Sequence, residues 1–272
     1  MENITPMSDH LDYYKQLCIK ASQDDEIFKD FRRDKIYRLY VDYFSYEVGD
    51  YCFNYIFDNP YINFTNKELK EFLNNDNYGT PLMYDYYNYL AKAICSATTL
   101  KYIKTFIDLH QHFDFKSINY ITEIGCGYGG QCRIILSKYP NIKYAIIDFP
   151  EVIELTKKYL SVFDTPDFKY TDRVNFISSD NLANSEVHGD LVISDYCFSE
   201  LTKKDQDMYL KKVISKHKNG YITWDAECFL LLDRYSGYEL YEFIKKLDFN
   251  VNIEPEKPVS TSKLNKIITF KK

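Results

Sequence analysis

The segment of this sequence that is most informative for chemistry is ITEIGCGYGGQC, residues 121–132, which holds four glycines within six residues. Glycine lacks a Cβ atom, so such a turn lets a backbone come very close to another group. An apolar run precedes the turn and a helical pattern follows it, as is typical of a cofactor-binding turn between a strand and a helix. Gly125, Gly127 and Gly130 satisfy the pattern G-x-G-x-x-G, and Asp148 ends the next predicted strand at the spacing of a ribose-binding acid. The turn therefore predicts an adenosine-bearing cofactor, either NAD or S-adenosylmethionine (SAM).

The charge beside the turn favours SAM over NAD. A pyrophosphate binds best at a helix N-terminus with no negative group next to it. Glu123 lies two residues before the first glycine, where it would repel a pyrophosphate but suits the cationic sulfonium and amino groups of SAM. Gly129, next to Gly130, also leaves room for a methionine moiety against the backbone. An NAD-binding oxidoreductase and a SAM-binding protein without activity remain the alternatives.

The predicted cofactor residues follow the ends of successive strands. We expect Asp148 to accept hydrogen bonds from both ribose hydroxyls, because one carboxylate can take two donors. Phe149 then packs on the adenine or, alternatively, in the core. Asp180 binds the adenine amino group or instead caps a short helix. The full predicted set is Glu123, Gly125, Gly127, Gly129, Asp148, Phe149, Asp180, Asn181 and Asp195.

The predicted catalytic residues lie in the segment SDYCFSEL, after the fourth strand. The family resemblance given at the end of this subsection implies methyl transfer from SAM to an aliphatic hydroxyl, which needs a base because such a hydroxyl is very weakly acidic. We expect Glu200 to be this base, with a plain first-turn helix acid as the alternative. Asp195 is expected to line the sulfonium or the acceptor hydroxyl, and a pairing of Asp195 with Asp225 could hold magnesium. The sequence supplies no third ligand, so we assign no metal. The predicted acceptor-binding residues are Tyr78, Gly79, Tyr196 and Asp225.

The pattern of elements changes near residue 117. Up to that point apolar residues recur at helical spacing, including a stretch from Met83 to Phe113, which predicts an N-terminal helical cap over residues 1–117. From residue 118 to 272 strand-like and helix-like segments alternate, which predicts a mostly parallel sheet. The predicted strands are 119–124, 143–148, 174–178, 190–195, 220–225, 250–253 and 266–270. The predicted helices between them are 130–138, 151–160, 203–216 and 238–246. The last two strands lack a helix between them and should pair antiparallel at the sheet edge.

Composition excludes several classes of protein. The chain has 272 residues, 45% hydrophobic and 27% charged, which is ordinary for a globular protein. A net charge of −6 argues against a nucleic-acid partner. No apolar stretch is long enough to span a membrane, and no leader pattern opens the chain, so we expect a cytoplasmic protein. The seven scattered cysteines predict free thiols, and the spacing of the histidines does not predict a metal site. A homodimer is left open.

The same motifs resemble a known fold and a known family. The turn EIGCGYGG, followed by IIDFP, resembles class I SAM-dependent methyltransferases, whose Rossmann-like sheet ends in an antiparallel hairpin. The four segments NYGTP, EIGCGYGGQCRII, YAIIDFPEVIELTKKYL and DLVISDYCFSELT resemble, in order and spacing, a family named as sugar O-methyltransferases. This resemblance implies SAM as cofactor and methyl transfer to a hydroxyl of a sugar or nucleotide sugar in glycan biosynthesis. Asp195 and Asp225 stand where that family leads us to expect Asn. The alternative is a methyltransferase acting on oxygen or nitrogen of a non-sugar small molecule.

Overall fold

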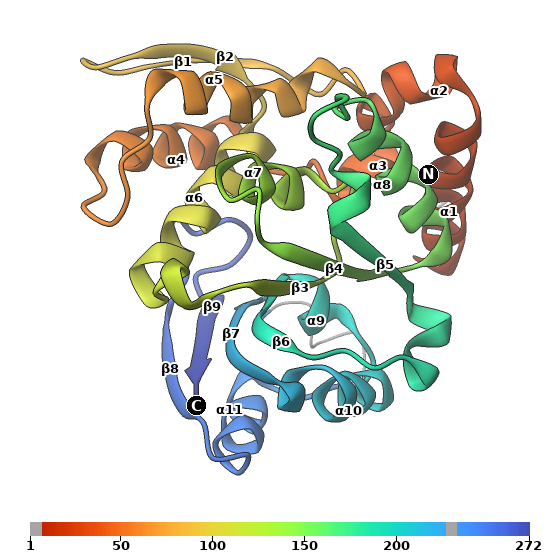
Figure 1. The fold of residues 1–272 in the computed structure, drawn as a ribbon, viewed down its shortest axis with the longest axis vertical. Coiled ribbons are helices and arrows are strands. Elements are labelled where there is room, and N and C mark those ends of the chain that lie inside the picture. The colour runs from red at the N-terminus through yellow and green to blue at the C-terminus, as the bar shows by residue number, and fades with distance from the viewer. Residues whose placement is uncertain (1–6, 227–232) are drawn as a thin grey trace, which may run out of the picture. The chain divides into compact units, whose positions relative to one another are not determined.

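A computed structural model describes residues 7–226 and 233–272 of the chain (Figure 1). The described residues divide into two compact units. Unit 1 contains residues 7–107, 127–138 and 149–172, and unit 2 contains residues 108–126, 139–148, 173–226 and 233–272. The predicted division between residues 117 and 118 stays a prediction.

Unit 1 is mostly helical. Within it α1 packs against α8, and α5 packs against α7. Its helices are α1 (Met7–Gln23), α2 (Asp25–Asp30), η1 (Phe31–Arg33), α3 (Lys35–Tyr40), α4 (Tyr46–Asp58), α5 (Asn66–Leu73), η2 (Asn74–Asn77), most of α6 (Ala97–His112), α7 (Gly130–Lys138) and α8 (Pro150–Ser161). The short turn η4 (Thr171–Arg173) follows. No helix in the described part of the chain is long and apolar enough to cross a membrane.

One expectation for unit 1 is wrong: residues 83–96 are not helical. They form an antiparallel hairpin of β1 (Tyr84–Tyr87) and β2 (Lys92–Cys95). Burial alternates with a period of two, since Tyr86 is fully buried whereas its neighbour Tyr87 is 71% exposed. The side chain of Asn88 closes the turn by accepting hydrogen bonds from two backbone N–H groups, those of Leu90 and Ala91. The repeated tyrosines of this stretch therefore follow strand spacing, and the helical pattern begins only at Ala97.

Unit 2 is built on a seven-stranded sheet with the order β5-β4-β3-β6-β7-β9-β8. The strands are β3 (Tyr120–Ile124), β4 (Lys143–Asp148), β5 (Val174–Ser178), β6 (Gly189–Asp195), β7 (His217–Trp224), β8 (Asn250–Pro255) and β9 (Lys266–Lys271). The first five are parallel, whereas β9 pairs antiparallel with both β7 and β8. All seven predicted strands are present, and the predicted fold class with its C-terminal antiparallel hairpin is confirmed.

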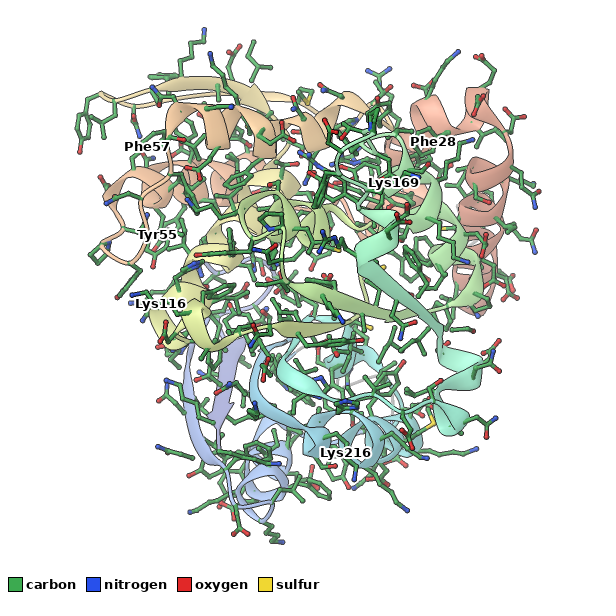
Figure 2. The ribbon with its side chains drawn as sticks, in the orientation of Figure 1. Phe28, Tyr55, Phe57, Lys116, Lys169 and Lys216 are labelled. Carbon is green, nitrogen blue, oxygen red and sulfur yellow. The ribbon has the colours of Figure 1, made fainter. Side chains whose placement is uncertain are left out.

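Helices of unit 2 cover an apolar face of this sheet. The helical elements of the unit are η3 (Phe115–Ser117), η5 (Ser179–Asn184), α9 (Cys197–Glu200), α10 (Lys203–Lys212), η6 (Ile214–Lys216) and α11 (Gly237–Lys245). Leu210 of α10 and Ile244 of α11 are fully buried in one cluster with Ile222 and Ile268 of the sheet. Lys216, labelled in Figure 2, lies exposed at the end of η6, directly before the fully buried His217. The predicted helix 203–216 is thus α10 followed by the short turn η6.

The strand order fixes where a ligand can bind. The chain passes from β3 outward to β4 and β5, then returns to place β6 on the other side of β3. In open α/β sheets this reversal leaves a crevice beyond the carboxyl ends of the two strands. Those ends are Ile124 of β3 and Asp195 of β6. Asp195 and Gly125, the residue after Ile124, are among the residues predicted to bind the cofactor.

Candidate functional site

The first half of the glycine turn belongs to unit 2 and is fastened to the end of β4. The backbone N–H of Gly125 donates to the carbonyl of Ile147 over 2.9 Å, and that of Cys126 donates to Asp148 Oδ2 over 2.8 Å. Gly125 has a φ of +76°, and a Cβ there would overlap the side chain of Cys197 at the start of α9. Glycine at position 125 is therefore required by the turn and by the close approach of α9. The half-buried Asp148 is held directly beside the turn, where its predicted ribose-binding role remains a prediction.

Glu123 is a buried carboxyl beneath this turn. Its side chain is 3% exposed, and its Oε2 accepts a hydrogen bond from the hydroxyl of Tyr144 over 2.9 Å. Desolvation is the main cause that raises the pKa of Glu123 to about 8. The hydrogen bond from Tyr144 lowers the pKa, whereas the negative charges of Asp195 and Asp148 raise it further. In the protein without ligand, Glu123 is therefore mostly protonated at neutral pH.

The carboxyl groups of Glu123, Asp148 and Asp195 indicate which cofactor the site can accept. The charges of Asp148 and Asp195 both disfavour a further negative charge at Glu123, so they make the potential at this carboxyl more negative. A pyrophosphate would be repelled there, whereas the sulfonium and ammonium groups of SAM would be attracted. The residues at the ends of β3, β4 and β6 fit SAM.

The second half of the turn belongs to unit 1 and is also shaped by protein contacts. Gly127 has a φ of +55°, and a Cβ there would lie 2.9 Å from Cγ1 of Val41. The carbonyl of Gly127 accepts a hydrogen bond from the Thr156 hydroxyl of α8 over 3.2 Å. A Cβ at Gly129 would lie 2.7 Å from Cγ2 of the same threonine. These positions are thus glycine because of backbone conformation and packing, in addition to any approach of a cofactor.

Asn75 holds the start of α7 and was not among the residues that the sequence singled out. Its amide nitrogen donates to the carbonyl of Gly130 over 3.1 Å. Its Oδ1 accepts hydrogen bonds from Arg133 Nε over 2.5 Å and from the Tyr159 hydroxyl over 2.9 Å. Asn75 and Arg133 are fully buried. The only sequence signal was that Asn75 lies just before NYGTP.

A second buried cluster surrounds Arg32 in unit 1. The guanidinium forms ion pairs with Asp42 at 2.7 Å and with Asp76 at 3.1 Å. It also lies over the ring of Tyr128, with its Cζ 4.3 Å from the centroid. Tyr128 is the residue between the second and third glycines, so this cluster holds the middle of the turn in place. Arg32 was not predicted, because its partners lie far from it in the sequence.

The NYGTP segment, predicted to bind the acceptor, packs tightly within unit 1. Gly79 has a φ of +81° and its carbonyl accepts a hydrogen bond from the Arg32 backbone over 3.0 Å. Tyr78 packs its ring against Phe163 at 5.2 Å and against Phe28 at 6.0 Å between centroids. Phe28 is labelled in Figure 2. These contacts give both residues structural roles, and acceptor binding by them remains a prediction.

Phe149, predicted to lie on the adenine, starts α8 in unit 1. Its ring is half-buried, and the ammonium of Lys15 lies 3.9 Å from its centroid. Asp180 and Asn181 lie exposed in η5 of unit 2. Asn181 lines a shallow hollow with residues of β5, whereas Asp180 does not. The adenine-binding roles of all three stay predictions.

The exit of β6 is shaped by a strained backbone. Asp195 accepts a hydrogen bond from the hydroxyl of Thr223, and the next residue, Tyr196, has a φ of +71°. Such a conformation is costly for a residue with a large side chain and persists only when the surroundings fix it. The buried Tyr196 hydroxyl contacts the carboxylate of Glu256 and the hydroxyl of Ser260, both in the β8–β9 connection. The Tyr196 hydroxyl, which was predicted to bind the acceptor, is therefore hydrogen-bonded to other residues of the protein.

Glu200, the predicted base, ends α9 near the exit of β7. The Ser199 hydroxyl next to it accepts a hydrogen bond from the backbone N–H of Asp225 over 3.0 Å. Desolvation is the main cause that raises the pKa of Glu200 to about 7, and the charge of Asp225 raises it further, whereas that of Arg234 lowers it. Many protein atoms lie around this carboxyl and desolvate it, but the Glu200 residue is still exposed to solvent. A solvent-exposed carboxyl with a pKa of about 7 can exchange protons with a bound molecule near neutral pH.

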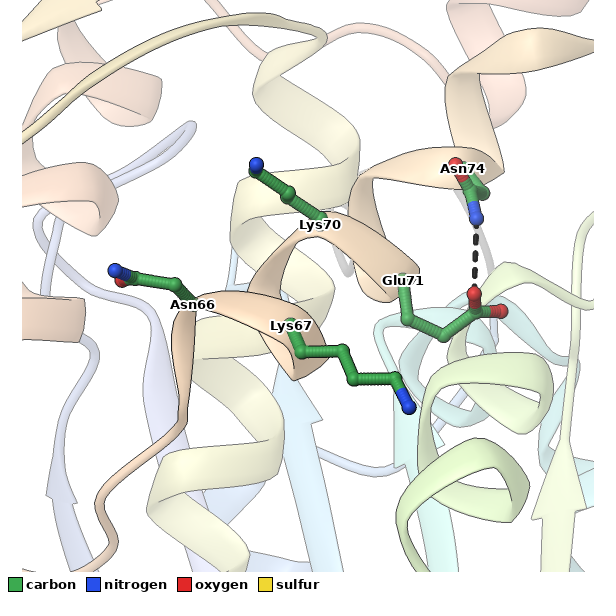
Figure 3. Close-up of a pocket in the computed structure, with 5 residues that line it drawn as sticks. All are labelled: Asn66, Lys67, Lys70, Glu71 and Asn74. Atoms are coloured by element: carbon green, nitrogen blue, oxygen red, sulfur yellow. Dashed lines mark hydrogen bonds between the residues drawn. The ribbon is translucent and has the colours of Figure 1, made fainter.

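Other features of the described residues lie outside this site. The clearest surface hollow of unit 1 lies along α5, lined by Asn66, Lys67, Lys70, Glu71 and Asn74 (Figure 3). Its side chains come from one helix and from the residue that follows it, and Asn74 donates to Glu71 over 2.9 Å. The hollow is open to solvent, and we assign it no role.

No group of three or more His, Cys, Asp or Glu side chains within residues 7–226 and 233–272 is placed to hold a metal ion. The six cysteines of these ranges are free thiols. Cys228 lies outside the described residues. Glu227, which the sequence offers as a further candidate base after Asp195 and Asp225 if Glu200 is not the base, also lies outside them.

The fold and the site together define a class of protein. A parallel sheet closed by an antiparallel hairpin, with a glycine turn after β3 and acids at the ends of β4 and β6, is the class I methyltransferase architecture. Residues 69–220 match the family model described as O-methyltransferase domain, which covers more than half of the chain. This chain belongs to that family of SAM-dependent methyltransferases. No curated protein matches the sequence significantly.

Solved structures of the same fold are distant in sequence. PigF with SAH is 16% identical, with a TM-score of 0.44, over 60% of this chain and 59% of that one. The mitomycin 7-O-methyltransferase MmcR is 15% identical, with a TM-score of 0.45, over 65% and 57%. An O-methyltransferase family protein from Burkholderia thailandensis is 11% identical, with a TM-score of 0.47, over 62% and 55%. The chain thus spans less than two thirds of the length of each of these three proteins.

Proposed function

We propose that this protein transfers the methyl group of SAM to a hydroxyl of a small organic molecule. The observation that carries the proposal is that the family match includes the glycine turn, Asp148, Asp195 and Glu200 together. The negative potential around Glu123 supports SAM in preference to NAD. SAM supplies an activated methyl group on a cationic sulfur, and the protein's own residues supply binding, orientation and proton removal.

Cofactor binding is proposed for the ends of β3, β4 and β6. Asp148 is held beside the turn by the Cys126 N–H, which supports a role in accepting hydrogen bonds from the ribose hydroxyls at little reorganisation cost. Glu123 is protonated before binding and would release its proton as the cationic ligand arrives, because a nearby positive charge favours the carboxylate. Asp195, bonded to Thr223, adds a further negative group on this side.

Proton removal is proposed for Glu200. The acceptor oxygen forms its bond to the methyl carbon while its O–H bond breaks and the proton passes to the carboxylate. A pKa raised to about 7 makes this carboxylate a stronger base than an ordinary glutamate, while a large fraction is still ionised near neutral pH. Asp225, fixed by Ser199, keeps the pKa of Glu200 raised.

The class of acceptor is the finer part of the proposal. The resemblance to sugar O-methyltransferases predicts a sugar, but the family that matches is defined by O-methyl transfer, and no comparison supports a sugar. The family match supports the alternative of a non-sugar small molecule better, and we adopt it as the leading class. Sugars and nucleotide sugars remain the second class to be tested.

The test is a turnover assay with a panel of acceptors. Purified protein is incubated with SAM and with phenols, hydroxy acids, aliphatic alcohols, sugars and nucleotide sugars in turn. Mass spectrometry then detects a gain of one methylene unit and the formation of demethylated cofactor. Methylation of a non-sugar hydroxyl compound is the expected result. Methylation of sugars alone would instead support the sugar acceptor that the resemblance to sugar O-methyltransferases implies. Binding of SAM without any methylated product in a broad panel would favour a SAM-binding protein without activity.

A further inference from the structure

Arg234 is a buried cation that the proposed mechanism does not yet use. Its residue is 7% exposed, yet Nε, Nη1 and Nη2 all lack a hydrogen-bond partner among residues 7–226 and 233–272. Burying a charge without a partner is expensive, and buried polar groups of native proteins are nearly always bonded. A guanidinium presents five N–H donors in a rigid plane. An unpaired guanidinium is therefore matched to an anionic group that residues 7–226 and 233–272 do not supply.

The backbone on both sides of Arg234 is fixed, so its position is not an accident of a free loop. The carbonyl of Asp233 accepts a hydrogen bond from the backbone N–H of Lys203 over 2.7 Å. The backbone N–H of Tyr235 donates to Gln206 Oε1 over 2.8 Å, and Gln206 is fully buried. Both contacts are to α10. They hold the arginine between two anchored neighbours.

The same contacts place Arg234 near the proposed base. Gln206 Nε2 donates to the carbonyl of Phe198 in α9 over 2.9 Å, two residues before Glu200. The charge of Arg234 acts on Glu200, which shows that the guanidinium lies within electrostatic range of that carboxyl. No ion pair within 4.0 Å joins Arg234 to Glu200 or to Asp225 in the part of the chain that the structure describes. The guanidinium therefore lies near the proposed base and does not form an ion pair with Glu200 or Asp225 in the described part of the chain.

We propose that Arg234 binds an anionic oxygen group of the acceptor, so that the substrate is a hydroxyl compound bearing a carboxylate or a phosphate. Guanidinium groups recognise both through paired N–H···O hydrogen bonds, which set orientation as well as affinity. Such a contact would hold the acceptor while its hydroxyl faces Glu200. It also resolves the charge balance, because the acceptor's anion neutralises the arginine. The inference rests on the proposed function and narrows its substrate class.

The test is binding of matched probe pairs in the presence of demethylated cofactor. The carboxylate pair is 2-hydroxybenzoate and its neutral amide, and the phosphate pair is glucose 6-phosphate and glucose. Calorimetry on wild-type protein should show the anionic member of at least one pair binding on the order of ten- to a hundredfold more tightly, the worth of a hydrogen bond to a charged group. The pair that responds shows whether the anion is a carboxylate or a phosphate.

Three variants complete the experiment. Arg234→Gln should abolish the preference, and Arg234→Lys should keep part of it, because lysine retains the charge but not the paired geometry. Arg173→Gln, at an exposed arginine of the same unit, should leave the preference intact. Circular dichroism and SAM affinity confirm that each variant is folded.

Two results would overturn the inference. One is that wild-type protein binds the anionic and the neutral probe of each pair equally well. This result can be interpreted without any variant. The other is a preference that survives Arg234→Gln. Because binding requires no methyl transfer, either result leaves the proposed function standing. Absence of turnover with the anion preference intact would instead count against the proposed function alone.

Discussion

The backbone N–H of Cys126 donates a hydrogen bond to Asp148 Oδ2 over 2.8 Å, which ties the glycine turn after β3 to the acid that ends β4. One oxygen of the carboxylate is thereby used to hold the turn. Asp148 thus has two roles, in the shape of the turn and in the proposed recognition of ribose. The variants below separate such structural roles from roles in binding.

Asp148→Ala should weaken SAM binding by about 1.5–3 kcal/mol, the range for hydrogen bonds to a charged group. Asp148→Asn keeps an acceptor for the Cys126 N–H and should lose less. Calorimetry with SAM measures both variants, and Asp172→Asn, at an exposed acid, serves as the control. If turnover fell while SAM affinity stayed at the wild-type value, Asp148 would belong to the acceptor.

Glu123 should make stability and SAM affinity depend on pH in opposite directions. The folded protein keeps a proton on Glu123 up to about pH 8, whereas the unfolded chain releases it near the ordinary glutamate pKa of 4.5. Between these values the unfolded state binds fewer protons, so the free energy of unfolding should fall by about 1.4 kcal/mol per pH unit as pH rises. The contribution is fully present below pH 4.5 and lost above pH 8.

Glu123→Gln should flatten this slope in urea unfolding measured at several pH values. SAM affinity of wild-type protein should rise with pH over the same window, because a cationic ligand prefers the ionised carboxylate. The variant should lose this rise as well. Parallel pH profiles for wild type and variant in both measurements would show that Glu123 is already ionised in the free protein.

Asn75→Ala should destabilise unit 1 and loosen the start of α7. The substitution leaves the buried Nε–H of Arg133 unpaired, which costs about 1.5–3 kcal/mol of unfolding free energy. The Tyr159 hydroxyl loses one acceptor but keeps the backbone carbonyl of residue 75. Asn75→Asp can still accept both bonds but cannot donate to the Gly130 carbonyl. If that contact positions the turn, Asn75→Asp should weaken SAM binding even where stability is largely kept. Unchanged SAM affinity in a folded Asn75→Asp protein would restrict Asn75 to packing.

Glu200→Gln should lower kcat by roughly 10²–10⁴-fold, the usual worth of a general base. The wild-type rate should rise with pH through about 7, since only the ionised carboxylate can take the proton. The variant should lose that limb of the pH profile while SAM affinity stays the same. Near-normal turnover of Glu200→Gln would show that Glu200 is only an acid at a helix end. Asp195 or Asp225 would then become the candidate base.

Much of the sheet could be predicted because its signals are local. β4 and β5 begin and end at the predicted residues, since apolar runs there stop at polar turn residues. The apolar runs of β4 and β6 likewise placed Asp148 and Asp195 at strand ends. The β1–β2 hairpin was missed because its tyrosines mask an alternating pattern that only burial makes visible.

The parts of the site that were not predicted depend on contacts across long sequence separations. Arg32 meets Asp76, and Tyr196 meets Glu256, only after the chain has folded. The glycines show a different limit of sequence reasoning. A side chain at Gly127 would need an unfavourable backbone and would meet Val41, so Gly127→Val tests the turn itself and not the cofactor volume.

The most direct test of the central claim follows the methyl group itself. Wild-type protein is incubated with SAM carrying a deuterated methyl group and with the acceptor found in the panel, and the product is analysed by mass spectrometry and NMR. The proposed function predicts an intact deuterated methyl on the acceptor oxygen, with one molecule of demethylated cofactor formed per methylated product. Label on carbon or nitrogen, or demethylated cofactor formed without any labelled acceptor, would contradict it.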